Sequence, residues 1–345
     1  MGVSTLDAWL NSYCGNGDAM RMAVADTVRH LATAASNVRK AIGEGALGVA
    51  FGGTRGSANS DGDIQKDLDV LADDVFLTAM RDSPVAYYAS EELHDPVELD
   101  RAKPLALAID PLDGSSNIDT NVSIGTIFSI LPALETMNDT FLQPGRAQLG
   151  AGFFIFGPQF AFVVSLGKGT SIFVFSARLG TFVQAYESLQ IGPDAKEFAV
   201  NTSNYRHWDE AVRLYIDDCI QGTDGPRGKD FNMRWIASLV ADTYRILVRG
   251  GVFLYPPDNR KGYRNGRLRL VYEANPIAML VEGAGGSATN GLTPILDLKP
   301  TDIHQRTALI FGATREVEKI TRYHTEPSAI GSRHPLFGNR GLFRS

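Results

Sequence analysis

Two aspartates, a glycine and two serines lie together in the segment Asp110–Asn117, which reads Asp-Pro-Leu-Asp-Gly-Ser-Ser-Asn. This segment directly follows the apolar run Leu105–Ile109, a pattern that predicts a buried strand. Mg²⁺ prefers carboxylate and carbonyl oxygens as ligands, and successive backbone N–H groups in a turn form a concavity that suits phosphate. One short segment therefore offers a metal site beside an anion site, the combination that metal-assisted phosphate chemistry needs.

Taken alone, an Asp-Pro-x-Asp-Gly sequence is often only a turn, because Asp begins it, Pro fixes φ and Gly supplies a positive φ. Further acidic residues near the ends of apolar elements favour a site instead. Glu91 and Glu92 follow the stretch Val85–Ala89, Asp63 and Asp69 lie further upstream, and Glu273 follows the run Leu268–Tyr272. Gathered together, these acids would repel one another unless cations neutralised them. Mg²⁺ ions about 3.5–4 Å apart would do so and would clamp both oxygens of a phosphoryl displacement. Spacing alone leaves open the alternative of separate, solvated helix ends.

The 345 residues, 44% hydrophobic and 21% charged, have an ordinary globular composition, and the length suits two domains. A formal net charge of −6 argues against general nucleic-acid binding. Cys14 and Cys219 have no metal-binding or C-x-x-C spacing, so we expect two reduced thiols, with Cys219 in the core. No signal peptide and no apolar run of membrane-spanning length is visible, and a cytoplasmic protein without membrane contact is expected.

The order of apolar patterns predicts the first unit of the fold. A helix over residues 20–42 is expected to end at Gly43, Gly45 and Gly48. The Gly- and Ser-rich stretch 52–57 is interpreted as a mobile loop near the site, and a second helix is predicted over Leu68–Met80. An antiparallel meander is then expected, with strands over Ile124–Leu131, Ala151–Phe156, Phe160–Leu166, Ser171–Phe175 and Thr181–Tyr186.

The sequence Ile191–Asp194 is interpreted as a boundary between two units, residues 1–193 and 194–330, with a tail over 331–345. The second unit is predicted to contain helices over Trp208–Gln221 and Arg234–Arg249 and strands over Gly251–Tyr255 and Leu268–Tyr272. A further helix is expected to start at Asn275 as the N-cap, with Pro276 at its first position.

Several motifs in sequence order resemble the metal-dependent, lithium-sensitive sugar and inositol phosphatase superfamily: Ser90–Glu92, Asp110–Ser115 and the late Glu273. Four further stretches narrow the resemblance to the bacterial type of the class I fructose-1,6-bisphosphatase family, over roughly residues 20–315: Ser116–Asp119, Val122–Phe128, Gly250–Pro256 and Leu268–Pro276. The resemblance implies a layered α/β fold, the five-layer αβαβα sandwich of this superfamily, in a homotetramer built from dimers.

The resemblance also implies a role for each matching residue. Mg²⁺ would be the cofactor, two or three ions per subunit and replaceable by Mn²⁺ or Zn²⁺, with the ligands Glu91, Glu92, Asp110, the Leu112 carbonyl, Asp113 and Glu273. Asp69 and Glu92 would activate the attacking water as a general-base pair, with Asp63 at the edge of the site. Substrate would contact Asp113, Gly114, Ser115, Ser116, Asn201, Tyr205, Trp235, Leu239, Tyr255, Arg267 and Arg269, and Arg234 would reach the neighbouring subunit's site.

Some positions depart from the family pattern. Trp235 stands where Tyr is frequent, and its indole N–H can donate a hydrogen bond but not accept one. Arg267 stands where Lys is usual, which replaces a point donor by a planar fork. The places that bind the inhibitor AMP in animal members hold Gly17–Met20, Pro104–Leu105 and Pro132, so we expect weak or absent inhibition of that type. Cys14 and Cys219 do not match the regulatory disulfide of chloroplast members.

The implied activity is Mg²⁺-dependent removal of the 1-phosphate of fructose 1,6-bisphosphate, in gluconeogenesis or the Calvin cycle. One alternative is a dual enzyme that also hydrolyses sedoheptulose 1,7-bisphosphate. An inositol monophosphatase is less favoured, because Tyr205, Arg234 and Tyr255 suit a second phosphate. A catalytically inactive sugar-phosphate sensor is the alternative from another class, and it is disfavoured because none of the metal acids is missing from the sequence.

Overall fold

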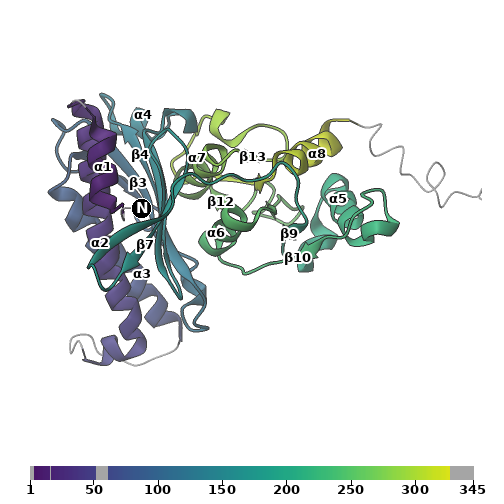
Figure 1. Cartoon of the computed structure of the whole chain (residues 1–345), viewed down its shortest axis with the longest axis horizontal. Helices are drawn as coiled ribbons and strands as arrows, with labels where there is room; N and C mark the ends of the chain where they lie inside the picture. The colour runs from purple at the N-terminus through teal and green to yellow at the C-terminus, as the bar shows by residue number, and fades with distance from the viewer. Residues whose placement is uncertain (1–3, 16, 52–60, 327–345) are drawn as a thin grey trace, which may run out of the picture.

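The computed structural model describes residues 4–15, 17–51 and 61–326, with the backbone alone described for 44–51 and 61–67. In this part of the chain two β-sheets alternate with layers of helices along the longest axis of the molecule (Figure 1). The predicted loop over 52–57 and the tail over 331–345 lie outside the described residues. No described helix combines the length and apolar character needed to cross a membrane.

Eight strands form the larger sheet. They are β1 (Val85–Ser90), β2 (Val97–Glu98), β3 (Leu105–Asp113), β4 (Ile124–Pro132), β5 (Gly150–Phe156), β6 (Phe160–Ser165), β7 (Ser171–Ser176) and β8 (Thr181–Tyr186). The order is β2-β1-β3-β4-β5-β6-β7-β8, and the strands from β4 onward pair antiparallel in chain order, which confirms the predicted meander. All nine residues of β3 are buried, because helices cover both faces of the sheet, and this explains the continuous apolar run in its sequence.

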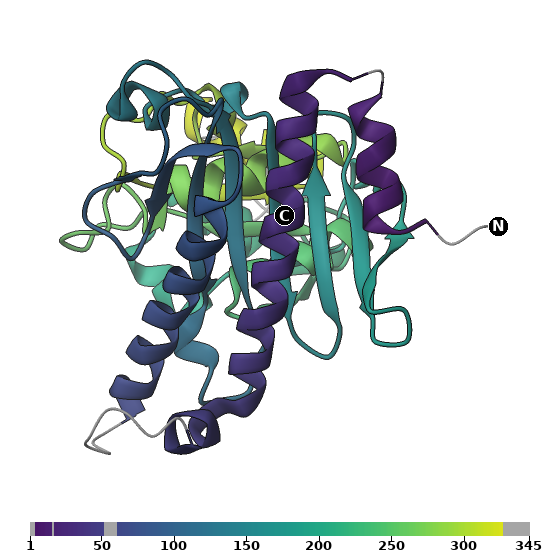
Figure 2. The same cartoon turned by 90° about the vertical axis from the view of Figure 1, so that its left-hand side faces the viewer.

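Three helices cover the outer face of this sheet (Figure 2): α1 (Leu6–Cys14), α2 (Ala19–Phe51) and α3 (Asp61–Arg81). The apolar spacing of α2 predicts a stripe of six residues; five of them, Val24, Val28, Leu31, Ala35 and Val38, are in the core, and the sixth, Ile42, is partly buried against it. The predicted end of α2 at the glycines was wrong, since the helix continues to Phe51. Gly43 does not take the left-handed φ with which glycine ends a helix, and a glycine inside a helix costs only about 1 kcal/mol.

The second sheet has five strands, in the order β10-β9-β11-β15-β13. Their bounds are β9 (Glu197–Ala199), β10 (Asn232–Met233), β11 (Val252–Tyr255), β13 (Ser287–Thr289) and β15 (Leu309–Gly312). Helices α6 (Leu239–Arg249) and α7 (Asn275–Gly283) pack between the two sheets, and α5 (Glu210–Gln221) and α8 (Thr314–Thr325) cover the far face of the second one. The layers are therefore α, β, α, β, α, which confirms the five-layer sandwich. A short helix, α4 (Met137–Phe141), and a ribbon of β12 (Leu268–Arg269) and β14 (Arg306–Thr307) complete these elements.

Two helices of the second unit begin later than predicted, because a polar side chain caps each of them. Helix α5 begins after Asp209, whose carboxylate accepts the N–H of Val212. Helix α6 begins after Ser238, whose hydroxyl accepts the N–H of Ala241. The residues before Ser238, predicted as helix, instead continue from β10, and the N–H of Arg234 donates to Phe198.

The run Leu268–Tyr272, predicted as a strand, pairs only over Leu268–Arg269 and then winds into a π-helical turn over Leu270–Ala274. The backbone N–H of Arg269 donates to the carboxylate of Glu273, four residues later, and this hydrogen bond spans the turn. Because this turn runs directly into α7, Asn275 is the first residue of the helix and caps nothing, and Pro276 is the second residue, one position later than predicted but still in the first turn. Cys219 is buried as expected, and both cysteines are free thiols.

Candidate active site

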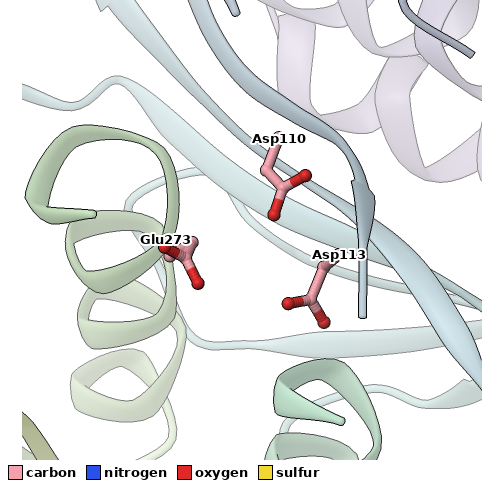
Figure 3. A group of neighbouring side chains, drawn as sticks. All are labelled: Asp110, Asp113 and Glu273. Atoms are coloured by element: carbon pink, nitrogen blue, oxygen red, sulfur yellow. The ribbon is translucent and has the colours of Figure 1, made fainter. Parts of the chain in front are cut away.

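Three buried carboxylates from two distant parts of the chain converge in one place (Figure 3). Asp110 and Asp113 come from the end of β3 and Glu273 from the π-helical turn before α7. In a regular strand, residues three apart point to opposite faces. The pairing of β3 with β4 shifts register between Asp110 and Asp113, and such an irregularity re-aims side chains, so that both aspartates face Glu273. One carboxylate oxygen from each residue lies within 4.8 Å of the others.

Backbone groups hold these carboxylates in place. Asp110 accepts the N–H of Leu112 at 3.1 Å, and Asp113 accepts the N–H of Val240 from the first turn of α6 at 3.2 Å. Asp110, Asp113 and Glu273 are only 6–7% exposed. Burial, followed by the charge of Glu91, raises the pKa of Asp110 and of Glu273 well above the usual range, and burial raises that of Asp113 to about 7.

A divalent cation fits this donor set, because its possible side-chain ligands are all carboxylate oxygens and like charges at this range need a neutralising partner. Asp110, Asp113 and Glu273 are three of the acids expected to bind metal. Glu91, a fourth, adjoins them and pairs with Arg269 at 3.1 Å. Arg269, expected to bind substrate, thus lies against the acidic cluster and also donates to the His304 carbonyl at 2.8 Å. The Leu112 carbonyl stays a predicted ligand.

Asp69 and Glu92 form a second pair of acids beside this cluster. Asp69 comes from α3, hydrogen-bonds with Ser115, and has a buried oxygen, Oδ1, with no hydrogen-bond partner among the described residues. Burial and the charge of Glu91 raise the pKa of Asp69 to about 6. Glu92 is exposed as a whole residue, but partial burial of its carboxyl and the charges of Asp69 and Glu91 raise its pKa to about 7. Carboxyls that titrate near neutral pH can take a proton from water. The side chain of Asp63 lies outside the described residues.

The segment after Asp113 lies between the acidic cluster and the start of α6. Gly114 takes a left-handed φ of 77°, which lets the chain turn into the 3₁₀ turn Ser115–Asn117. The side-chain amide of Asn117 donates to the Ala237 carbonyl at 2.8 Å. Leu239, expected to touch the sugar, is the first residue of α6 and lies directly after the cap. The predicted substrate contacts therefore lie beside the acidic cluster: Ser115, Ser116 and Leu239. A substrate that contacts both the cluster and these residues needs this arrangement.

A separate pocket gathers several of the residues expected to hold the second phosphate. Asn201, Trp235 and Tyr255 line it together with Asn204, Trp208, Asp258 and others. Arg267 donates to the Tyr255 hydroxyl at 3.4 Å. Tyr205 packs edge-on against Trp208 and donates its hydroxyl to Asp217. Arg234 lies elsewhere, in a small hollow with Glu197 and Arg245, and its predicted role in a neighbouring subunit stays a prediction.

Two residues that contact the predicted site residues or their neighbours are not predicted from the sequence, Tyr263 and Asp242. The Tyr263 ring lies 4.0 Å from the Arg267 guanidinium, and its hydroxyl accepts a hydrogen bond from Arg267 at 2.9 Å. Asp242 is buried in α6 and accepts the N–H of Ile236, beside Ala237, whose φ of 66° is unfavourable for a residue other than glycine. Only the basic run around Tyr263 gave a sequence signal, since Asp242 looks like an ordinary polar position of a helix.

The raised pKa values predict how the metal-free protein responds to pH. The unfolded chain releases the protons of Asp69, Glu92 and Asp113 near pH 4, whereas the folded chain keeps them until about pH 6 to 7. The folded state binds more protons in this window, so the free energy of unfolding falls as pH rises through it. We expect the melting temperature in EDTA to drop by several degrees from about pH 4.5 to 8.

Two other aspartates do not produce this fall in melting temperature, and Mg²⁺ changes it. Asp209 and Asp258, whose pKa values are lowered by hydrogen bonds, finish titrating below the window and do not contribute to the drop. Saturating Mg²⁺ should reduce the drop, because the cation replaces the protons of the metal-binding acids, whereas Asp242, whose pKa burial also raises to about 7, lies outside this donor set and keeps its contribution. A melting temperature that rises with pH in EDTA would contradict the assignment of these carboxyls as protonated in the metal-free protein.

The fold and the acidic cluster together define the class of metal-dependent sugar phosphatases. Residues 16–187 match the family model described as the N-terminal domain of fructose-1,6-bisphosphatase, and residues 191–325 match the C-terminal domain. The chain is 62% identical to a class 1 fructose-1,6-bisphosphatase of Rhizobium meliloti (strain 1021), over all of both chains, and 54% identical to one of Azorhizobium caulinodans, over 94% of this chain and all of the relative. It therefore belongs to the class 1 fructose-1,6-bisphosphatase family.

A solved structure supports the same assignment at the level of the fold. The structure of Leishmania major fructose-1,6-bisphosphatase in holo form superposes with a TM-score of 0.83 at 28% identity, and covers 94% of this chain and all of that one. The apo form superposes with a TM-score of 0.82 at 27% identity.

Proposed function

We propose that this chain hydrolyses the 1-phosphate of fructose 1,6-bisphosphate and releases fructose 6-phosphate and phosphate. The observation that carries the proposal is the buried trio Asp110, Asp113 and Glu273, which lies beside two further carboxyls of raised pKa, Asp69 and Glu92. A phosphoryl transfer needs mainly positioning and neutralisation of charge, and this arrangement, in a member of the family, provides groups for both.

Each part of the site has a task in this reaction. Bound Mg²⁺ would neutralise the charge on the phosphoryl oxygens and on the leaving oxygen. The metal would be held by Glu91, Glu92, Asp110, Asp113, Glu273 and the Leu112 carbonyl. Asp69 and Glu92 would take the proton of the attacking water, which their pKa values near neutrality favour. The backbone of Gly114 and the Ser115 hydroxyl would orient the reacting phosphate.

The proposal includes the identity of the metal and the oligomeric state. Mg²⁺ is the favoured metal, with two or three ions per subunit, because the side-chain ligands that the cluster offers are all carboxylate oxygens. A homotetramer is proposed in which Arg234 reaches the neighbouring site, a role that suits its half-exposed guanidinium. The division into units at residue 193 and a cytoplasmic location stay predictions of the sequence.

The experiment that tests the proposal is phosphate release by the purified protein, with Mg²⁺, from fructose 1,6-bisphosphate and sedoheptulose 1,7-bisphosphate side by side. A strong preference for the six-carbon substrate supports the proposal. Comparable rates on both would make the chain a dual bisphosphatase, in line with the changes at Trp235 and Arg267. Release from neither would overturn the proposal and favour a sugar-phosphate sensor.

Arg267 offers a prediction about the second phosphate. Replacing Arg267 by Met removes a charge-assisted contact worth about 1.5–3 kcal/mol, so we expect KM for fructose 1,6-bisphosphate to rise about 10- to 100-fold with little change in kcat. Hydrolysis of fructose 1-phosphate, which lacks the second phosphate, should be unaffected. Arg264→Met, an exposed arginine of the same segment, is the matched control. Equal losses on both substrates would place Arg267 outside the second-phosphate pocket.

A further inference from the structure

A buried carboxylate lies beneath the proposed general-base pair, and the mechanism above gives it no task. Asp73 follows Asp69 by four residues on α3 and is only 5% exposed. Its Oδ1 accepts a hydrogen bond from the hydroxyl of the fully buried Tyr88 at 2.7 Å, and the Ser90 hydroxyl also hydrogen-bonds with it. Among the described residues, no Arg or Lys forms an ion pair with Asp73. The carboxylate is therefore held by two hydroxyls of β1 and not by a cation.

The contacts continue from Asp73 to the acids of the site. Ser90 is the last residue of β1, is 1% exposed, and accepts the N–H of Glu92 at 3.2 Å. Asp73 is thus one side-chain contact away from the backbone that carries Glu91 and Glu92. On α3, residues four apart lie on the same face, so Asp73 and Asp69 point to the same side of the helix, with Asp69 nearer the site.

This arrangement bears on the geometry of the base pair, because its two members come from different elements. Asp69 belongs to α3, whereas Glu92 follows β1, so the separation of their carboxyls depends on how α3 lies on β1. Apolar packing alone, such as that of Phe76, tolerates small shifts. A buried carboxylate with two hydroxyl partners tolerates fewer, because each lost hydrogen bond leaves a buried polar group unpaired.

Stability alone does not account for a carboxyl group buried at this position. Replacing buried polar or ionic groups by apolar ones of similar volume is often neutral or stabilising, and their best-attested benefit is to fix one arrangement among several. The elements that Asp73, Tyr88 and Ser90 fix are those that carry the proposed base pair.

We propose that Asp73 is a positioning residue for the hydrolysis: through Tyr88 and Ser90 it fixes α3 on β1 and the turn that follows β1, and thereby sets the separation and orientation of the Asp69 and Glu92 carboxyls. This inference rests on the general-base role proposed above for these two residues.

The experiment compares Asp73→Asn, Tyr88→Phe and Ser90→Ala with a matched control, Tyr215→Phe. Tyr215 is also fully buried and donates its hydroxyl to a buried carboxylate, that of Glu316 at 2.9 Å, in the separate core between α5 and α8. We measure melting temperature, kcat and KM for fructose 1,6-bisphosphate at saturating Mg²⁺. Tyr88→Phe and Asp73→Asn are expected to lower kcat about 10- to 100-fold with KM within about twofold, whereas Tyr215→Phe loses comparable melting temperature and keeps kcat.

The double variant and the control distinguish a positioning role of Asp73 from a purely structural one. The double variant Asp73→Asn/Tyr88→Phe should lose little more kcat than either single one, because the two residues act through one contact. If kcat follows melting temperature in the same way for Tyr88→Phe and Tyr215→Phe, Asp73 is only structural and the inference fails. Should Asp73→Asn not fold, Tyr88→Phe, which removes a single hydroxyl, decides alone. Glu92→Gln is measured alongside: full activity there would overturn the general-base role itself, independently of Asp73.

Discussion

Replacing Glu92 by Gln is expected to lower kcat about 10²- to 10⁴-fold, the usual contribution of a general acid or base. The amide has nearly the shape of the carboxylate, but it accepts no proton from the attacking water and binds a divalent cation weakly. The raised pKa of Glu92, about 7, reflects partial burial beside Asp69 and Glu91, and this environment is what poises the group for proton transfer near neutral pH. Steady-state phosphate release at saturating Mg²⁺ measures the effect.

The control for this prediction is Glu98→Gln, the same chemical change at an exposed glutamate that pairs with Arg101. Surface pairs of this kind contribute little, and kcat should stay at the wild-type value. KM for fructose 1,6-bisphosphate should change little in Glu92→Gln, because Glu92 carries no predicted contact with the substrate. Wild-type turnover in Glu92→Gln would remove Glu92 from the base pair and leave Asp69 to act alone.

Asp110→Asn should have two effects of opposite sign. Loss of one carboxylate from the cluster is expected to weaken Mg²⁺ binding at least about 100-fold, beyond the 10- to 100-fold that residues supporting a metal ligand contribute, and to reduce turnover accordingly. In EDTA, by contrast, the variant should be more stable than the wild type. Burial, together with the charges of Glu91, Asp113 and Glu273, raises the pKa of Asp110, which lowers the free energy of unfolding at any pH well above the unfolded-chain pKa of about 4. A neutral amide of the same shape removes this cost.

Two measurements check this prediction together: Mg²⁺ titration by calorimetry, and thermal melts in EDTA and in Mg²⁺. The wild type should gain more stability from Mg²⁺ than the variant, because at a given concentration a ligand stabilises the folded state more, the more tightly it binds to it. Asp82→Asn, at an exposed position, is the matched control and should leave both quantities unchanged. A variant that binds Mg²⁺ normally, or that melts below the wild type in EDTA, would contradict the role of Asp110 in the cluster.

Much of the local structure could be predicted, because short-range patterns determine it. The strands of the meander follow from their runs of Val, Ile and Phe and the turns between them, and Thr181–Tyr186 has the predicted bounds. The stripe on α2 predicted which of its residues enter the core. Several predictions failed because a side chain from outside the pattern formed a hydrogen bond that the pattern does not show. Leu270 and its neighbours look like a strand, but the Glu273 carboxylate accepts the N–H of Arg269 and winds them into a π-helical turn.

By itself, the amino-acid sequence determined the inventory of the site: which acids exist, that Asp110 and Asp113 follow a buried strand, and which family they resemble. Only the tertiary structure decided which acids share one space. Glu273 joins Asp110 and Asp113 because α7 packs on the face of the sheet from which they project. Arg269 pairs with Glu91, and Asp73 reaches Tyr88, through contacts between elements that no local pattern encodes. The physical reason is that periodicity predicts which face of an element is apolar, whereas burial and pairing of charges depend on which two faces meet.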